Sequence, residues 1–413
     1  MTALPVLGVR TRATRLSRRL SDAEVRERRL KRRIGTIWGL LILNVLSFAP
    51  GVSVIPIPSA VGKAITQGAL QLALVLALIL NPRLKFRPNV FLLLVTLMAL
   101  ETVLTEFSAQ YPKGTGFRTF RYVEFVAILW LLSPYWDRAD MLIARLHLKF
   151  MMWVLGSVAV GYIVAHGHAM EGGRLGGAIW PIDPTQVAHY AAVTIGMVVI
   201  FWFCGQMRGR TTLLIVAFSM VILLLSHTRT ALVAEVAGLL VGGLSLIVAT
   251  PRVRRLFGTL AAIAAVAFAA ASSAITSWMA RGEGTSGLTS LSGRTGFWAP
   301  LLSYPRTIFQ EIFGFGLSNG SFNGLPIDSN WMISYQQQGL FGVVMCAVIL
   351  IYLLIAGSFQ PRGIRRALVL FFAVYVLIAS FTEDGITDAS PYLLDVTLAA
   401  SLLLPIARRR RAA

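Results

Sequence analysis

Long apolar stretches alternate along this chain with short polar loops. A helix needs roughly 20 mostly apolar residues to cross the hydrocarbon layer of a bilayer. By that rule the pattern predicts about 12 spans. They are expected near residues 35–55, 60–80, 89–108, 118–133, 147–166, 185–204, 211–227, 229–249, 256–277, 338–357, 365–382 and 389–406. The sequence therefore predicts an all-α protein that crosses a membrane many times.

One long polar interval, Arg281 to Gly342, interrupts the apolar pattern. It is rich in glycine and serine, yet aromatic residues recur through it: Phe297, Trp298, Phe309, Phe313, Phe315, Phe322 and Trp331. A disordered linker lacks such residues, which supply the buried area that stabilises a folded segment. Loops of this length are usually functional. We expect a large, partly helical loop outside the cytoplasm over 278–337.

Composition excludes a soluble protein. Of the 413 residues, 56% are hydrophobic and only 14% are charged, and the mean hydropathy is +0.71. The pattern indicates one membrane domain over 34–407, between a basic tail at 1–33 and a second basic tail at 408–413. The first tail is expected either to lie on anionic lipids or to remain solvated and only set the orientation.

The net charge of +20 raises the question of nucleic acid. The basic residues lie in short loops and tails, however, which is the orientation signal of membrane proteins, so no nucleic-acid partner is expected. Alternate loops are basic: Arg83, Lys85 and Arg87; Arg138 and Arg145; Arg208 and Arg210; Arg252, Arg254 and Arg255; Arg362, Arg365 and Arg366; Arg408 to Arg411. The loops at 51–59 and 383–388 contain neither Lys nor Arg. Both termini are therefore predicted to be cytoplasmic, in a multi-pass protein of the cytoplasmic membrane.

Some residues within the apolar stretches carry no predicted chemistry. Cys204 and Cys346 have no metal-ligand spacing and suggest no disulfide framework. Gly238 and Gly242 form a GxxxG pattern, which is typical of close helix packing.

Arginines on the predicted outer side oppose the orientation rule: Arg174, Arg229, Arg294 and, less clearly, Arg306. A guanidinium group binds phosphate oxygens through two parallel hydrogen bonds and keeps its charge. We expect Arg174, Arg229 and Arg294 to bind a lipid-linked pyrophosphate. The alternatives are contacts with lipid phosphates and ion pairs with Glu235 or Glu283.

Two histidines lie near these arginines. His227 neighbours Arg229 and is predicted to be a hydrogen-bonded turn residue that supports the site. His189 is predicted to face the bundle interior, in a helix that Asp183 opens as N-cap and Pro184 as the first helical residue.

Arg118 and Arg121 begin the fourth predicted span. We expect them to be structural and to pair with Glu101, Glu106 or Glu124, because charges inside a membrane usually pair. The chain contains no HExxH and no phosphate-binding Gly-rich loop. Neither a metal site nor ATP use is indicated.

Several short motifs occur in a specific order. The run LLLSHTRTALVAEVAGLLVGGL resembles the signature segment of the O-antigen ligase and O-antigen polymerase family, in which a Ser-x-x-Arg or Ser-Arg-Thr pattern opens a span before the large outer loop. SGRTGFW, GFGLSNGSF and QQQGLFGVV are similar to the family's Gly-Arg-x-x-x-Trp, Gly-x-Gly and Glu-x-Gly-x-x-Gly elements. The resemblance covers roughly residues 210–349.

The resemblance implies a metal-independent, inverting transfer of a glycan from a polyprenyl-pyrophosphate carrier to an acceptor hydroxyl, outside the cytoplasmic membrane. It implies no cofactor. It also implies roles for Arg229 and Arg174. Partners would be the lipid-linked oligosaccharide, a glycan acceptor, membrane lipids and a flippase or chain-length protein.

One position departs from the family pattern. Ligases of the family have a His-Asn pair about eleven residues before the glycine matched by Gly339, and here that position holds Asp328. A polymerase, or a ligase onto an acceptor other than lipid A core, is therefore favoured over a lipopolysaccharide ligase. Asp328 is a candidate for the base that takes the proton of the acceptor hydroxyl. The alternative is that Asp328 or Ser329 caps the next helix.

Two other functional classes remain open. A lipid-linked glycan flippase or other transporter would place charges through the membrane midplane and often shows internal repeats. Here the charges collect on the outer side and no repeat is evident. A non-catalytic assembly subunit would need no convergent arginines.

Overall fold

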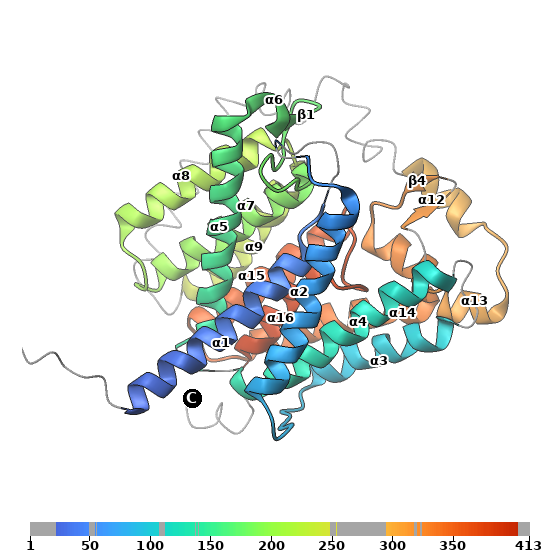
Figure 1. Cartoon of the computed structure of the whole chain (residues 1–413), viewed down its shortest axis with the longest axis horizontal. Coiled ribbons are helices and arrows are strands. Elements are labelled where there is room, and N and C mark those ends of the chain that lie inside the picture. Colours follow the sequence, from blue (N-terminus) through green and yellow to red (C-terminus); the bar gives the residue numbers. More distant parts are fainter. Residues whose placement is uncertain are drawn as a thin grey trace, which may run out of the picture.

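Helices account for nearly all regular structure in the computed structural model, which describes residues 22–48, 54, 56–106, 112–136, 138, 140–247, 253, 295–317, 320–322 and 324–403. The helices are α1 (Asp22–Val45), α2 (Ser59–Leu80), α3 (Val90–Thr105), α4 (Pro112–Leu132), η2 (Ser133–Tyr135), α5 (Leu142–Val164), α6 (His166–Ala169), α7 (Pro184–Phe203), α8 (Gly209–Leu225), α9 (Arg229–Ile247), α12 (Thr295–Leu302), α13 (Ile308–Phe313), α14 (Asn330–Ser358), α15 (Ile364–Ala379) and α16 (Pro391–Leu402) (Figure 1). The strands in these ranges form two antiparallel hairpins, β1 (Met170–Glu171) with β2 (Arg174–Leu175) and β3 (Ser321–Phe322) with β4 (Leu325–Pro326).

Five helices, α2, α5, α7, α9 and α14, are long and apolar enough to cross a membrane, and α3, α8 and α16 are shorter apolar helices. Every predicted span except 256–277, which lies outside the described residues, overlaps a helix. The outward faces are apolar, as lipid contact requires: Leu213 and Leu214 of α8 are 68% and 72% exposed. The chain is therefore a helical protein with the surface of a membrane protein.

The first predicted span begins earlier than expected. The span predicted from residue 35 is the second half of α1, which begins at Asp22 and carries the basic segment and the apolar segment on one helix. The span predicted from residue 338 belongs to α14 (Asn330–Ser358), and its predicted start lies next to a break in that helix at Gly339. α1 extends past the apolar stretch because polar residues with good helix propensity continue it.

The loops gather at two ends of the bundle. One end, here called the basic end, consists of loops 81–89, 133–141, 204–208 and 359–363. Arg145 Nη2 donates to Gln206 Oε1 at 2.9 Å, and Arg365 donates to the Arg138 carbonyl and to the Leu402 carbonyl. These contacts join loops that the charge pattern predicts to be on one side of the membrane.

The opposite end consists of segments 46–48, 165–183, 226–228 and 380–390. The Asp183 amide donates to Ser47 Oγ at 3.0 Å, and the Thr382 hydroxyl donates to Thr230 Oγ1 at 2.6 Å. The described loops therefore separate into the two groups expected from the alternation of basic and non-basic loops.

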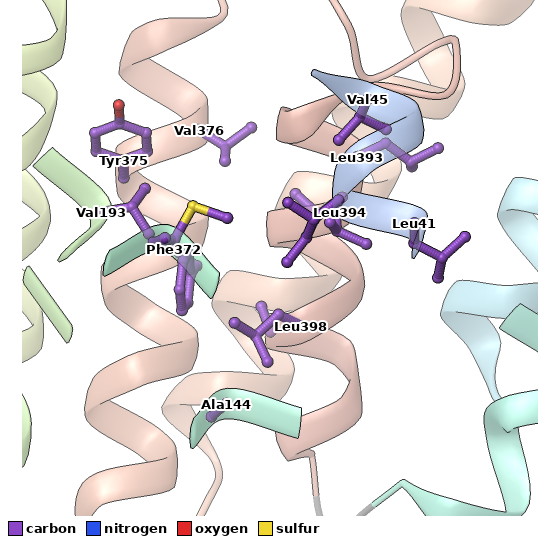
Figure 2. Packing of buried hydrophobic residues seen from close by; sticks show 14 of the residues in the cluster. Leu41, Val45, Ala144, Val193, Phe372, Tyr375, Val376, Leu393, Leu394 and Leu398 are labelled. Carbon is purple, nitrogen blue, oxygen red and sulfur yellow. The ribbon is translucent and has the colours of Figure 1, made fainter. Parts of the chain in front are cut away.

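The core lies where α1, α5, α7, α15 and α16 meet. Leu41 and Val45 of α1 lie near Leu393 and Leu394 of α16, and Phe372 of α15, near Val193, belongs to the same buried cluster (Figure 2). All these side chains are buried. Their packing holds together segments from the beginning, middle and end of the chain.

Helix α9 lies against α15 at the predicted GxxxG pattern. A Cβ at Gly238 would be 3.0 Å from the Phe371 carbonyl oxygen, and one at Gly242 would be 2.8 Å from the Ala367 carbonyl oxygen. A larger residue at either position would push the helices apart, which confirms the predicted close packing.

Helix α14 is broken at Gly339, which has φ 61° and ψ −158°. The break frees carbonyls of the preceding turn. The Phe315 amide donates to the Gln336 carbonyl at 3.0 Å, and the Gly316 amide donates to the Gln337 carbonyl at 2.9 Å. The two stretches singled out in the sequence, GFGLSNGSF and QQQGLFGVV, therefore meet here. Their contact fixes the segment around Phe315 and Gly316 to α14.

Candidate functional site

Arg174 lies against the turn that leads into α9. The β1–β2 hairpin presents it, and the hairpin turns at two glycines with positive φ, Gly172 and Gly173. Arg174 Nε donates to the Ser226 carbonyl at 3.1 Å, and Nη2 donates to Thr228 Oγ1 at 3.0 Å. The hairpin is thereby fixed beside the first turn of α9.

Arg229 is the first residue of α9. Its Nε and Nη2 atoms are buried, and neither has a hydrogen-bond partner among the described residues. A buried donor without an acceptor costs free energy, and more so when it is charged. The start of a helix adds exposed backbone N–H groups and a positive dipole end. An anion with several oxygen atoms would accept hydrogen bonds from Nε and Nη2 of Arg229 and would balance its charge.

His227 occupies the turn between α8 and α9, as predicted. It has φ 49°, a left-handed conformation that is uncommon for a residue with a side chain, and its amide donates to the Leu224 carbonyl at 3.2 Å. The turn reverses the chain sharply, and Arg229 directly follows Thr228, which Arg174 contacts.

Asp328 comes two residues before α14. The N-cap position itself belongs to Ser329, whose side chain makes no capping hydrogen bond to the part of the chain described. The start of the helix is held instead by the loop at 380–390. The Asn330 amide donates to the Ser380 and Glu383 carbonyls at 2.9 Å, and Asn330 Oδ1 accepts from the Ile386 amide at 2.8 Å. Of the two residues predicted as alternatives for the N-cap, Ser329 therefore occupies that position, without a side-chain capping hydrogen bond, and Asp328 does not.

The loop at 380–390 contacts both the start of α9 and the start of α14. Its Thr382 is bonded to Thr230, the residue after Arg229, and its Glu383 carbonyl binds the start of α14. The arginine at the start of α9 and the carboxylate before α14 thus border one loop, although about 100 residues separate them in the sequence. The sequence analysis used this loop only for orientation, because its short polar run matches no motif.

Of the other predicted arginines, Arg306 has a structural position. Nη2 donates to Gln336 Oε1 at 2.7 Å, and the guanidinium carbon lies 4.2 Å from the centre of the Tyr335 ring and 4.9 Å from that of Phe315. Arg306 therefore holds the segment around Phe315 against α14 through a hydrogen bond and cation–π contacts. Arg294 lies outside the described residues.

His189 faces the bundle interior, as predicted, within a polar network that the sequence analysis missed. His147 Nε2 lies 3.2 Å from Asp395 Oδ1, and His189 Nε2 lies 3.3 Å from Asp395 Oδ2. Both contacts are ion-pair distances without the alignment of a hydrogen bond. His189 Nδ1 also lies 3.1 Å from the Tyr375 hydroxyl oxygen. The signal for this network was an isolated ionisable residue in each of three apolar stretches.

The predicted helix start beside His189 is confirmed. Asp183 is the N-cap residue of α7 and Pro184 is at its first turn. The Asp183 side chain, however, makes no capping hydrogen bond with any residue in the described ranges. The Asp183 carboxylate is therefore not used to cap α7.

The predicted partners of Arg118 and Arg121 were wrong. Arg118 Nη2 lies 2.8 Å from Asp388 Oδ2, and Arg121 Nη2 donates to the Ala389 carbonyl at 2.6 Å. Burial alone would raise the pKa of Asp388, but the charges of Arg118 and Arg121 outweigh burial and lower it. Glu124 instead accepts from Gln71 at 2.5 Å. The arginines hold the loop at 380–390 against α4.

A cavity of about 240 Å³ opens beside this loop. Ser47, Arg118, Asp183, His189, Asp384 and Tyr392 are among the residues that line it. Asp384 is exposed to it, yet the surrounding chain desolvates the carboxylate and raises its pKa, and Arg118 opposes that shift. No three His, Cys, Asp or Glu side chains within the described residues are grouped so that they could hold a metal ion.

The chain was also compared with known proteins. No model of a protein family and no curated protein matches it, so the functional argument depends on the geometry of its own residues.

Proposed function

We propose that this protein is a glycosyltransferase similar to the O-antigen ligase and O-antigen polymerase family. It would act as a surface-polysaccharide polymerase or ligase and transfer a glycan from a polyprenyl-pyrophosphate carrier to an acceptor sugar hydroxyl. The observation that carries the proposal is Arg229, whose buried guanidinium nitrogens have no acceptor in the described chain. A pyrophosphate supplies such acceptors, and Arg174 holds the adjacent turn in place.

In this proposal Arg229 binds the leaving group. Its hydrogen bonds strengthen as the bond between the anomeric carbon and the pyrophosphate oxygen breaks and negative charge develops on the pyrophosphate. The acceptor oxygen attacks the anomeric carbon from the opposite face, so the configuration inverts. Asp328 takes the hydroxyl proton as the new bond forms. Polyprenyl pyrophosphate then leaves.

The Asp328 role has its own test. Asp328→Asn keeps the shape and polarity of the side chain and removes the base, so we expect glycan transfer to fall by about 100-fold with an unchanged thermal unfolding midpoint. Transfer is measured on the purified full chain with lipid-linked oligosaccharide. A well-folded Asp328→Asn protein that transfers glycan at the wild-type rate would exclude Asp328 as the base.

The proposal includes a topology of about 12 spans, with both termini in the cytoplasm and the loop at 278–337 outside. In a Cys204→Ser background, Ile308→Cys on the 82%-exposed position of α13 should react with a membrane-impermeant maleimide in intact cells. Arg29→Cys on α1 should react only after the membrane is opened. The reverse pattern would invert the orientation and place the arginine site inside.

A flippase or other transporter is a second candidate, because the structure adds an observation in its favour. The His147–Asp395–His189 network lies in the bundle interior, and chains of such residues carry protons in transporters. The two candidates differ in product. A transporter moves lipid-linked glycan across a sealed vesicle without forming a glycosidic bond, whereas a glycosyltransferase forms that bond in detergent, where no compartments exist.

A further inference from the structure

The N-terminal half of α1 contacts the basic end through one group of charged side chains. Lys31 Nζ lies 2.8 Å from Asp140 Oδ2 and 3.5 Å from Glu27 Oε1. Arg138 Nε lies 3.2 Å from Asp140 Oδ1, and Arg138 Nη2 also pairs with Glu27. Burial alone would raise the pKa of Asp140, but its contacts with Lys31 and Arg138 outweigh burial and lower it to about 2. The group has two cations and two anions, so it is balanced, and it fixes which face of α1 points toward the bundle.

The opposite face of α1 carries arginines that take no part in this group. Arg26, Arg29 and Arg33 have the i, i+3, i+7 spacing of residues on one helix face. Successive residues of a helix are rotated by about 100°, so that face lies opposite Glu27 and Lys31. Like charges three or four residues apart destabilise a helix unless anions balance them. The arginines of this segment are exposed, and none forms an ion pair within the described residues: Arg26, Arg28, Arg29, Arg32 and Arg33.

The arginine face, defined as Arg26, Arg29 and Arg33, lies where the apolar part of α1 begins. Arg33 directly precedes Ile34, and buried apolar residues recur from there to Val45. With a rise of about 1.5 Å per residue, Arg26 is about 10 Å from Arg33 along the helix. The headgroup layer on each side of a bilayer is roughly 5–8 Å thick, and the long arginine stem lets the guanidinium group reach along the helix toward it. The first turns of α1 (blue) extend past the neighbouring helices, so the bundle does not cover them (Figure 1).

Lipid phosphates match this face in charge, in position and in hydrogen-bonding geometry. A guanidinium group binds phosphate oxygens through two parallel hydrogen bonds. Basic residues beside a membrane helix are attracted to anionic lipids. We propose that the arginine face of α1 binds the phosphate groups of anionic phospholipids in the leaflet at the basic end. This binding is independent of the proposed glycan transfer.

Native mass spectrometry of the full-length protein tests the proposal. The protein is held in detergent micelles that contain phosphatidylcholine in excess over phosphatidylglycerol, so that a neutral headgroup competes with an anionic one. We expect the wild type to retain phosphatidylglycerol about ten-fold above its share of the lipid. The Arg26→Gln/Arg29→Gln/Arg33→Gln variant should lose most of this enrichment. The Arg26→Lys/Arg29→Lys/Arg33→Lys variant keeps the charges and should retain most of it.

The matched control removes three charges from the same end of the bundle. Arg83, Arg208 and Arg210 are also exposed, and the Arg83→Gln/Arg208→Gln/Arg210→Gln variant should keep the enrichment. Equal losses in the two glutamine variants would mean that the basic end attracts anionic lipid without a site on α1, and would overturn the proposal. A wild type that retains both lipids in proportion to their supply would overturn it as well, and would leave the N-terminal segment as a solvated orientation signal.

Discussion

Replacement of Arg229 by lysine should lower the rate of glycan transfer by about 100-fold, because removal of one donor aimed at developing charge typically has an effect of that order. Lysine keeps the positive charge but loses the planar fork that can bind two oxygens of a pyrophosphate at once. Because Nε and Nη2 of Arg229 make no hydrogen bond to the described chain, their loss should leave the fold intact. The turnover number and the Michaelis constant for the lipid-linked donor are measured separately, and we expect the turnover number to fall.

Arg145→Lys is the matched control for Arg229→Lys. Arg145 is exposed at the basic end and donates to Gln206. The same change of side chain there should leave transfer within about two-fold of the wild type, because exposed surface substitutions have small effects. An Arg229→Lys protein as active as the wild type would contradict the proposed role of the guanidinium group. It would mean that transfer needs only a positive charge at this position, or does not depend on this side chain.

Gly339→Ala should be the most destabilising single change in the outer part of α14, by roughly 3 kcal/mol. The φ of 61° strains any residue with a side chain, and a Cβ at Gly339 would lie 2.5 Å from the carbonyl carbon of Ile312, which is backbone and cannot rotate away. The break would then either close or push the outer loop off the helix. Thermal unfolding of the purified protein, followed by tryptophan fluorescence, measures the effect.

Gly156→Ala on α5 is the control for that experiment. No heavy atom of the described residues lies within 4 Å of a Cβ built at Gly156. Alanine is about 1 kcal/mol more favourable than glycine inside a helix, so the unfolding midpoint should stay or rise. A Gly339→Ala midpoint as high as that of Gly156→Ala would contradict the role assigned to the break.

The positions of the helices could be predicted because the length of an apolar stretch is a local property. The partners of polar groups could not. Arg118 was assigned to nearby carboxylates, whereas its partner Asp388 lies 270 residues further along the chain. His147 and Asp395 went unnoticed because each is a single ionisable residue among apolar ones, and only the packing of α5, α7 and α16 brings them together.

The arginine site could be predicted in part. The orientation rule singled out Arg174 and Arg229 as basic residues on the unexpected side, and in the structure Arg174 on β2 contacts the turn that precedes Arg229. The sequence could not show that the break in α14 is at Gly339, because a glycine followed by apolar residues also fits an unbroken span. The positive φ of Gly339 depends on its tertiary contacts and not on the conformational preference of the local sequence.

The buried network has a consequence for how the chain is made. Asp395 lies on α16, the last helix in the described chain, whereas its partners His147 and His189 lie on α5 and α7. During synthesis the two histidines enter the lipid long before the carboxylate that they contact has been translated. Until α16 inserts, the central helices carry polar groups that lipid cannot satisfy. A chain that stops short of α16 would therefore have an unsatisfied centre, because His147 and His189 would lack the carboxylate that they contact in the finished bundle.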